Sequence, residues 1–414
     1  MIQENSPKWL AGFRSDYDKF FVKKWSSYMG AVLLMMVILG LMINGMVWGV
    51  FGGVKFWGDW FNNFIGLGPF LGLPSERGSV WLNSMSLMNI NLVLGAFCAA
   101  LLSRQFSPVR PPKLEYVWAA LGGVLMGTGA ALAGGCTTGG FFNPVLHSSP
   151  AGWAMWLGLL AGAAIGFKLL LWTLENIDWG TQAPPALKVP ERVIAAYPWL
   201  GWGVALGALV WALLWLYSGS APLVYRAPIV LASFAIGFIM HRSRICFSRA
   251  FREPFVTGEG EMTKAVILAL AIGLPLAALL FQKKVIDPYS AIPATFWLGS
   301  LLGGLVFGIG MIFSGGCASG SLWRMGEGHL KLWVSMFFFA WTGSTASALF
   351  KRFNLTSVDQ DSADVFERTA LGFQAYMPDM FSSWGVTFAA SASLLVLWYG
   401  LVRYNESTEK FTLM

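Results

Sequence analysis

The chain has 414 residues, of which 56% are hydrophobic and only 12% are charged. A water-soluble protein of this size needs more polar residues than this to cover its surface. The composition therefore excludes a soluble protein and indicates one that lies in a lipid bilayer. The formal net charge of +7 does not require a nucleic-acid partner, because basic loops beside an anionic lipid surface account for it.

Apolar stretches predict the membrane spans. A helix needs roughly 20 apolar residues to cross the hydrocarbon core. Stretches near this length occupy residues 29–53, 84–103, 116–134, 152–174, 198–217, 223–241, 264–282, 295–316, 330–350 and 381–403. We therefore expect an all-α polytopic membrane protein with nine or ten transmembrane helices.

The order of the spans suggests two halves. We expect a cytoplasmic N-terminal segment (1–28), a first transmembrane half (29–175), a linker (176–197), a second half (198–350) and a polar stretch with one more transmembrane helix (351–414). Short cytoplasmic loops retain Lys and Arg, and the N-terminal segment is basic. The N-terminus is therefore expected in the cytoplasm, and the first span is read as an uncleaved anchor.

Two stretches repeat each other without a gap. Residues 121–139, LGGVLMGTGAALAGGCTTG, align with residues 302–320, LGGLVFGIGMIFSGGCASG, at an offset of 181, and nine of the nineteen pairs are identical. Seven of these identities are glycines and one is the cysteine pair Cys136 and Cys317. Small residues that let helices approach explain the glycines but not the cysteines. We interpret the match as an internal repeat.

The span count places the two copies in opposite orientations, which is typical of transporters whose substrate site lies between inverted repeats. Gly134–Gly135 and Gly315–Gly316 are expected to break their helices, and a re-entrant half-helix is expected to restart at each cysteine. The new helix N-termini would direct free N–H groups towards an anion. These groups belong to Thr137, Thr138 and Gly139 in the first copy, and to Ala318, Ser319 and Gly320 in the second.

The four cysteines form no C-x-x-C pair, which argues against a thioredoxin-like relay or a zinc site. A thiol buried among glycines and apolar residues is expected to stay neutral. It is then a weak hydrogen-bond donor suited to a soft sulfur acceptor. Cys246 lies in an arginine-rich segment with Arg242, Arg244 and Arg249, which we expect to collect anions on the cytoplasmic side. Cys98 is the weakest candidate, because a lone membrane cysteine commonly serves packing alone.

The paired GGC motifs, the segment RSRICFSRAFRE and the later LWRMGEGHLKLW resemble the YeeE/YedE family of membrane proteins, and are most similar to its YedE branch. The resemblance implies uptake of thiosulfate or a related sulfur compound along a cysteine-lined path. It assigns that role to Cys136 and Cys317, to Cys246, and more weakly to Cys98. It also implies a small cytoplasmic sulfur-carrier protein as a partner and the bacterial inner membrane as the location.

Two other functions remain open at the level of the sequence. A selenium species, with a larger and softer chalcogen, would suit the same cysteines. A membrane thiol protein that passes a persulfide from Cys246 to a carrier is the alternative from another class. No nucleotide-binding loop of the G-x-x-x-x-G-K-[ST] form occurs in the sequence, so ATP is not expected to drive transport. We expect no enzyme activity, no cofactor and no metal, and the sequence does not indicate an oligomeric state.

Overall fold

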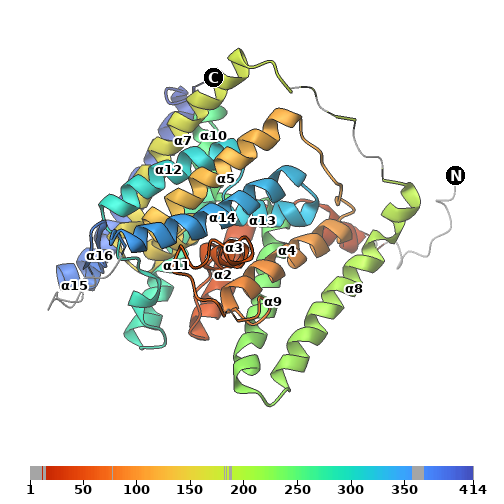
Figure 1. The fold of residues 1–414 in the computed structure, drawn as a ribbon, viewed down its shortest axis with the longest axis horizontal. Helices are drawn as coiled ribbons and strands as arrows, with labels where there is room; N and C mark the ends of the chain where they lie inside the picture. The colour runs from red at the N-terminus through yellow and green to blue at the C-terminus, as the bar shows by residue number, and fades with distance from the viewer. Residues whose placement is uncertain are drawn as a thin grey trace.

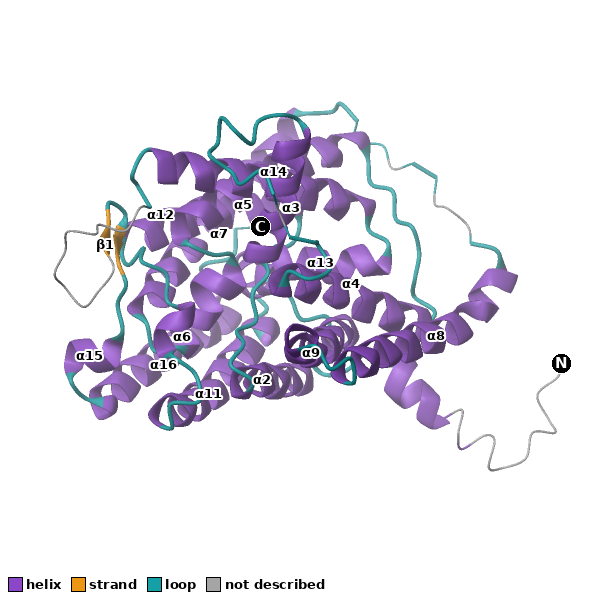
Figure 2. Cartoon of the chain, turned by 60° about the horizontal axis from the view of Figure 1, so that its bottom comes forward, coloured by secondary structure: helices purple, strands orange, loops and turns teal. Residues whose placement is uncertain are grey.

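The computed structural model describes residues 12, 15–76, 78–180, 182, 184–185, 189–356 and 368–413, and these form an all-α polytopic membrane protein (Figure 1). Parts of the expected N-terminal segment, linker and polar stretch lie outside these residues. In the described part, the one sheet pairs β1 (Arg368–Thr369) with β2 (Gly372–Phe373) at one edge of the molecule (Figure 2).

Eight described helical stretches are long and apolar enough to cross a membrane, and a ninth counts if the bent pair Ser15–Val22 and Ser27–Ile43 forms one span. The helices in chain order are η1 (Asp18–Val22), α2 (Ser27–Ile43), α3 (Phe51–Phe64), α4 (Ser84–Leu102), α5 (Lys113–Ala133), η2 (Thr137–Phe142), α6 (Asn143–Leu146), α7 (Pro150–Asn176), α8 (Glu191–Leu216), α9 (Ala221–Ser243), α10 (Phe247–Val256), α11 (Glu261–Gln282), η3 (Pro288–Ala291), α12 (Leu298–Ser314), α13 (Ala318–Glu327), α14 (Leu330–Arg352), α15 (Met377–Phe381) and α16 (Trp384–Thr408).

The expected first span, 29–53, is wrong as a single helix. The helix α2 ends at Ile43, and a separate helix, α3, begins at Phe51 and continues past the end of the expected span to Phe64. Asn143 fixes the intervening turn, because its Nδ2 donates to the carbonyl of Trp48 at 2.5 Å. The turn begins at Asn44 and Gly45, where Gly45 has φ of 69°, but hydropathy averaged over a whole span does not register two such residues.

The expected span 330–350 forms a helix, α14, but its composition falls below that of the eight apolar stretches. Several of its hydroxyl groups bond within the protein. Thr342 Oγ1 donates to the carbonyl of Phe338 at 2.5 Å, and Ser344 Oγ donates to Asp59 of α3. A helix that packs one side against protein does not need an apolar surface all round, and α14 exposes Trp333 and Phe337 on its other side.

Close glycine contacts join α5 to α12. A Cβ at Gly122 would lie 2.7 Å from the carbonyl oxygen of Gly310, and one at Gly129 would lie 2.7 Å from that of Gly303. The order of these contacts makes the two helices antiparallel. The repeat offset of 181 converts one pair into the other, because Gly122 corresponds to Gly303 and Gly129 to Gly310. The two copies are therefore related by an approximate two-fold axis across the helices, as inverted repeats require.

The same relation extends to the next helices. Gly308 of α12 approaches Gly162 of α7, and Gly127 of α5 approaches Gly343 of α14. These pairs also exchange at the offset of 181. The order of elements repeats as well. The helices α2, α3, α4 and α5 correspond in order to α9, α10, α11 and α12. The segment η2–α6 then corresponds to α13, and α7 to α14. In Figure 1, α5, α7, α12 and α14 lie side by side, whereas α8 extends along the edge of the molecule.

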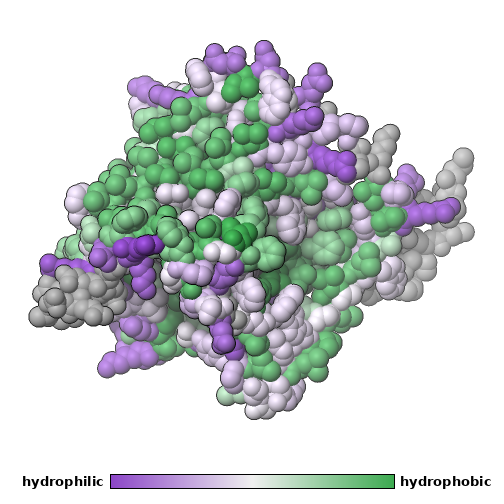
Figure 3. Space-filling model, in the orientation of Figure 1, coloured by the Kyte–Doolittle hydropathy of each residue, from purple (hydrophilic) through white to green (hydrophobic). Residues whose placement is uncertain are grey.

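Two ends of the molecule can be distinguished by their contacts. The basic end comprises residues 23–25, 105–109, 242–245 and 324–331. It is joined by the hydrogen bonds Trp25 N to Arg242 O, 3.0 Å, and Ser107 N to Glu327 O, 3.2 Å. The opposite end comprises residues 133–134, 289–296 and 372–377, where Gln374 Nε2 donates to the carbonyl of Ile292 at 2.9 Å. Between the ends, apolar residues cover much of the face seen in Figure 3.

Candidate substrate pathway

The first GGC motif breaks α5 as expected. Gly134 ends the helix with φ of 72°, a left-handed conformation that glycine adopts without the cost paid by other residues. Cys136 then caps a six-residue π-helix, η2, and its Sγ lies 2.9 Å from Thr138 Oγ1. Cys136, Thr137 and Thr138 are all buried.

The second GGC motif repeats this geometry. Gly315 ends α12 with φ of 81°, and Cys317 is the N-cap of α13. The Sγ of Cys317 lies 3.6 Å from Ser319 Oγ, which occupies the position of Thr138 in the repeat. One expectation is corrected here, because the N–H of Gly320 is not free. It donates to Cys317 Sγ at 3.3 Å, so the sulfur itself caps the helix.

Both motifs begin re-entrant segments. The carbonyl of Ala133, before the first break, accepts a hydrogen bond from Thr295 Oγ1 at 3.0 Å, and Ser149 Oγ, after α6, donates to the carbonyl of Ala375 at 2.6 Å. Both ends of this segment therefore lie at the opposite end of the molecule. The second segment, 315–329, starts and finishes at the basic end, where Arg324 Nη1 donates to the carbonyl of Gly315 at 3.0 Å.

Cys246 and Cys317 lie together. Their Sγ atoms are 3.9 Å apart, and both side chains are fully buried. Cys246 is the N-cap of α10, so two helix N-termini meet at this pair. The absence of a side chain at Gly320 makes room for both sulfurs, because a Cβ there would lie 2.6 Å from Cys246 Sγ and 3.1 Å from Cys317 Sγ. We call these two residues the thiol pair.

Aromatic rings connect the first re-entrant segment to the thiol pair. Phe142 of η2 and Phe247, the residue after Cys246, have ring centroids 5.3 Å apart, and Phe141 also meets Phe247 at 6.4 Å. All three side chains are buried. The structure therefore brings the segment that carries Cys136 against the helix that follows Cys246, with aromatic rings between them.

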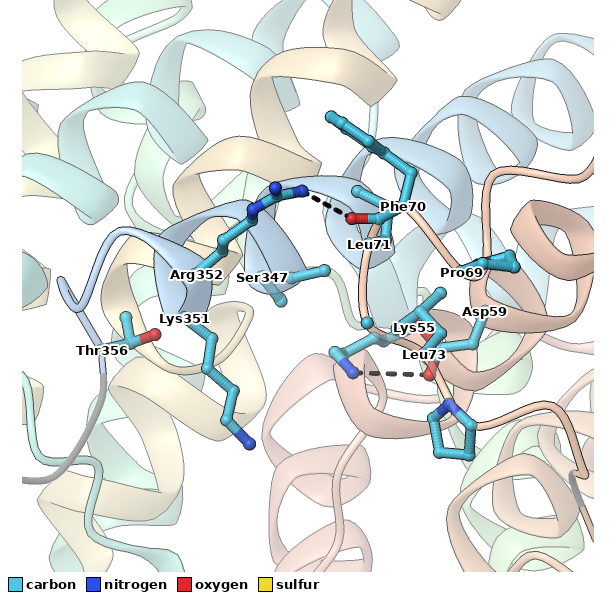
Figure 4. Close-up of a pocket in the computed structure, with 13 residues that line it drawn as sticks. Lys55, Asp59, Pro69, Phe70, Leu71, Leu73, Ser347, Lys351, Arg352 and Thr356 are labelled. Carbon is cyan, nitrogen blue, oxygen red and sulfur yellow. Dashed lines mark hydrogen bonds and ion pairs between the residues drawn. The ribbon is translucent and has the colours of Figure 1, made fainter.

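A hollow of about 300 Å³ opens beside the first motif at the opposite end. Gly134, Gly135 and Gly139 line it together with Val50, the N-cap of α3, and with Asn143. A larger hollow, of about 900 Å³, lies between α3 and the end of α14, where Lys55, Lys351 and Arg352 gather (Figure 4). No cysteine lines it, so size alone does not identify the pathway. The smaller hollow reaches the motif residues.

The arginines expected to collect anions have partners of their own. Arg242 is buried and donates to the carbonyl of Lys23. Arg244 Nη1 donates to Glu327 Oε1 at 2.6 Å, and Arg249 Nε donates to Glu253 Oε1 at 2.6 Å. The bonds of Arg242 and Arg244 tie the N-terminal segment and the end of α13 to the segment around Cys246, whereas that of Arg249 lies within α10.

Glu327 does not pair with Arg324, the arginine three residues before it in the sequence. Arg324 bonds the backbone at the second break, whereas Glu327 accepts from Arg244 and lies 3.5 Å from His241 Nε2. Burial lowers the pKa of the nearby His329 below its ordinary value, although the charge of Glu327 opposes the shift. His329 is then neutral at pH 7, so Arg244 is the main counter-charge of Glu327.

Cys98 lies away from the other three cysteines. Its buried Sγ donates to the carbonyl of Gly201 at 3.3 Å, at the contact of α4 with α8. This contact fits a packing residue at a helix–helix interface.

Two further groups face the motifs without protein partners. Among the described side chains, Thr137 Oγ1 and Ser321 Oγ are buried without a hydrogen-bond partner. Ser321 follows the second motif, and its Oγ would lie 3.0 Å from a Cβ on Gly316. Ser321 lies one residue beyond the repeated stretch, which ends at Gly320, so the repeat gave no signal for it. Buried polar groups usually have a partner, so these two hydroxyl groups are available to bond water or a transported ion.

Comparisons with known proteins agree with this architecture. A family model described as sulphur transport matches residues 2–165 and 242–412. "Probable transporter YedE" of Escherichia coli is 28% identical over 302 residues, which are 70% of this chain and 73% of that protein. "Thiosulfate transporter TsuA" of Spirochaeta thermophila is 36% identical over 110 residues, 27% of this chain and 33% of that protein. The TsuA of Escherichia coli is 33% identical over 103 residues.

Proposed function

Because the chain belongs to the sulphur transport family, we propose that it takes up a small sulfur-containing anion, with thiosulfate as the first candidate. The observation that carries this proposal is the thiol pair at two facing helix N-termini. Partial positive charge from the helix ends favours an anion, and the soft thiols suit its terminal sulfur. The proposed role is transport without covalent chemistry.

The proposed route begins at the smaller hollow, beside Gly135 and Gly139, and passes Cys136. It continues between Phe142 and Phe247 to the thiol pair and leaves at the basic end. The hydroxyl groups of Thr137 and Ser321 supply donors that the protein leaves unpaired. A weakly hydrated anion gives up water more readily than sulfate, so such a narrow, mostly apolar route selects for thiosulfate.

We also propose that the protein lies in a bacterial inner membrane with its basic end in the cytoplasm. The retention of Lys and Arg in short cytoplasmic loops supports this orientation. A small cytoplasmic sulfur-carrier protein is the proposed acceptor at that end. Its acidic groups would face the exposed parts of Arg244 and Arg249.

Uptake in cells that lack other sulfur importers tests the proposed function. The cells would express the parent chain or an empty vector, and would be supplied with thiosulfate, sulfite, sulfate or selenite. We expect growth and accumulation on thiosulfate that depend on the chain, with little uptake of sulfate. Equal uptake of thiosulfate with and without the chain would reject the proposal. Preferential uptake of selenite would reassign the substrate.

A further inference from the structure

The thiol pair has a second chemical property besides that of a hydrogen-bonding site. Cys246 and Cys317 come from helices far apart in the sequence, yet their Sγ atoms are 3.9 Å apart. An S–S bond is about 2.05 Å long, so the sulfurs need to approach by roughly 2 Å to form it. No described side chain lies between them, and Gly320 leaves the space beside both sulfurs open.

The surroundings of the pair favour reaction. A thiolate is the reactive form of cysteine, and helix N-termini and nearby cations stabilise it. Each cysteine caps one of two ten-residue helices, α10 and α13. Arg324 lies seven residues after Cys317 on α13. Its guanidinium donates to the carbonyl of Gly315, two residues before Cys317. Cys98, in contrast, lies in mid-helix and bonds a backbone carbonyl.

We propose that Cys246 and Cys317 form a reversible disulfide when a small peroxide reaches them, and that this bond closes the pathway. The closure rests on the proposed function, whereas the bond itself does not. In the first step one thiolate attacks hydrogen peroxide, the O–O bond breaks, and a sulfenic acid forms with release of hydroxide. The other thiol loses its proton as it attacks the sulfenic sulfur, and displaces the sulfenic oxygen as a second hydroxide. The two protons from the thiols convert the two hydroxides to water. The two sulfurs are oxidised by two electrons in total, and hydrogen peroxide is reduced by them.

The bond would remove what the proposed pathway uses. A disulfide has no S–H donor for the substrate's sulfur, and it would hold α10 against α13 at the point where both helices begin. Because both thiols are fully buried, only an oxidant about as small as the transported anion reaches them. Hydrogen peroxide meets that requirement, whereas glutathione disulfide does not.

Thiol counting in the purified full-length protein tests the bond without any transport measurement. Membrane-reconstituted protein would be treated with hydrogen peroxide, denatured and labelled with a maleimide, and its peptides would be analysed by mass spectrometry. The parent has four cysteines, and we expect two of them to become unreactive and to appear in one cross-linked peptide pair. Dithiothreitol should restore all four.

Matched variants locate the reaction. The double variant Cys98→Ala with Cys136→Ala retains the thiol pair and should form the same cross-link. The double variant Cys246→Ala with Cys317→Ala should lose no thiol under the same treatment. Gly320→Ala keeps both cysteines but places a methyl group beside both sulfurs, so it should form the bond at least several-fold more slowly. Absence of the cross-link in the parent, or its presence between other cysteines, overturns the proposal.

Uptake measured in parallel separates this proposal from the function on which the closure rests. We expect peroxide to abolish thiosulfate uptake by the parent and dithiothreitol to restore it. If the cross-link forms and uptake is unchanged, the closure is wrong. If the untreated parent shows no uptake although the cross-link forms, the proposed function fails while the disulfide stands.

Discussion

At the scale of single residues, the surroundings of three of the four cysteines set them apart in the sequence. Cys136 and Cys317 each follow a glycine pair, and Cys246 lies among arginines. The contact between Cys246 and Cys317 could not be predicted, because 71 residues separate them and no pattern specifies tertiary distance. The same limit applied to Glu327, whose partner Arg244 is 83 residues away, whereas Arg324 was close in sequence.

Serine substitutions distinguish contact between a thiol and the sulfur of the substrate from helix capping by the same side chain. Cys317→Ser retains an acceptor for the N–H of Gly320, so its free energy of unfolding should change by less than about 1 kcal/mol. Thiosulfate uptake should nevertheless fall at least tenfold, because a hydroxyl group is harder and better hydrated than a thiol. Cys98→Ser, in a helix contact, is the matched control and should transport normally. Normal uptake by Cys317→Ser would show that sulfur contact is unnecessary.

The buried carboxylate at the basic end should contribute measurably to stability. Glu327→Gln removes the charge that accepts from Arg244 at 2.6 Å and leaves that guanidinium without its counter-charge. A loss of about 1–3 kcal/mol is expected, since hydrogen bonds to charged groups are worth about that much. Glu253→Gln breaks an i,i+4 pair with Arg249 and should cost about 0.5 kcal/mol or less. Thermal unfolding in detergent gives both values, and equal losses would contradict the assignment.

At the scale of elements, helix breaks were predictable only where glycine required them. The positive φ values at Gly134 and Gly315 follow from the GG pairs, and the re-entrant segments follow from those breaks. The turn between α2 and α3 lacks a glycine pair. It starts at Asn44 and Gly45, with φ of 69° at Gly45, a weaker signal that hydropathy over a whole span does not register. The burial of α14 by α3 and α5 also depends on tertiary contacts, which composition does not report.

The two breaking glycines should differ in their tolerance of alanine. Gly315→Ala meets only the end of Lys331, 3.5 Å away, so the expected cost is the left-handed backbone alone, about 1–2 kcal/mol. Gly134→Ala adds a Cβ 2.6 Å from Pro293 Cβ and should cost more. Gly207→Ala, on α8 with open space around it, is the control and should be neutral or slightly stabilising. Thermal unfolding of the three variants orders them, and a reversed order at Gly134 and Gly315 would be contrary to the structure.

At the scale of the whole molecule, the nineteen-residue match predicted the inverted repeat, but the structure shows that it extends through α2–α7 and α9–α14. Obvious sequence identity between the two copies remains only where α5 and α12 contact each other through glycines. The surrounding helices meet different neighbours, such as α8 and α16, and apolar residues replace one another freely there. The symmetry also exposes a difference between the copies, because Val50 caps α3 where Cys246 caps α10.

Repeat-related glycines should be equally sensitive to bulk. Gly122→Leu and Gly303→Leu each place a side chain against the backbone of the facing helix, so each should separate α5 from α12. The cost should exceed the roughly 1–3 kcal/mol of ordinary overpacking, because backbone atoms cannot move aside as side chains do. Gly203→Leu on α8 has open space and should be tolerated. Size-exclusion chromatography in detergent would record the yield of monodisperse protein, and a normal yield for either core variant would contradict the packing.

The proposed function requires the thiol pair to carry a sulfur anion across the membrane. Its most direct test is the initial rate of radiolabelled thiosulfate entry into proteoliposomes that contain purified protein, either the parent, Cys246→Ser with Cys317→Ser, or Cys98→Ser. We predict saturable entry for the parent and for Cys98→Ser, competition by unlabelled thiosulfate but not by sulfate, and a rate near that of empty liposomes for the double variant. Entry through the double variant at the parent's rate would contradict the claim.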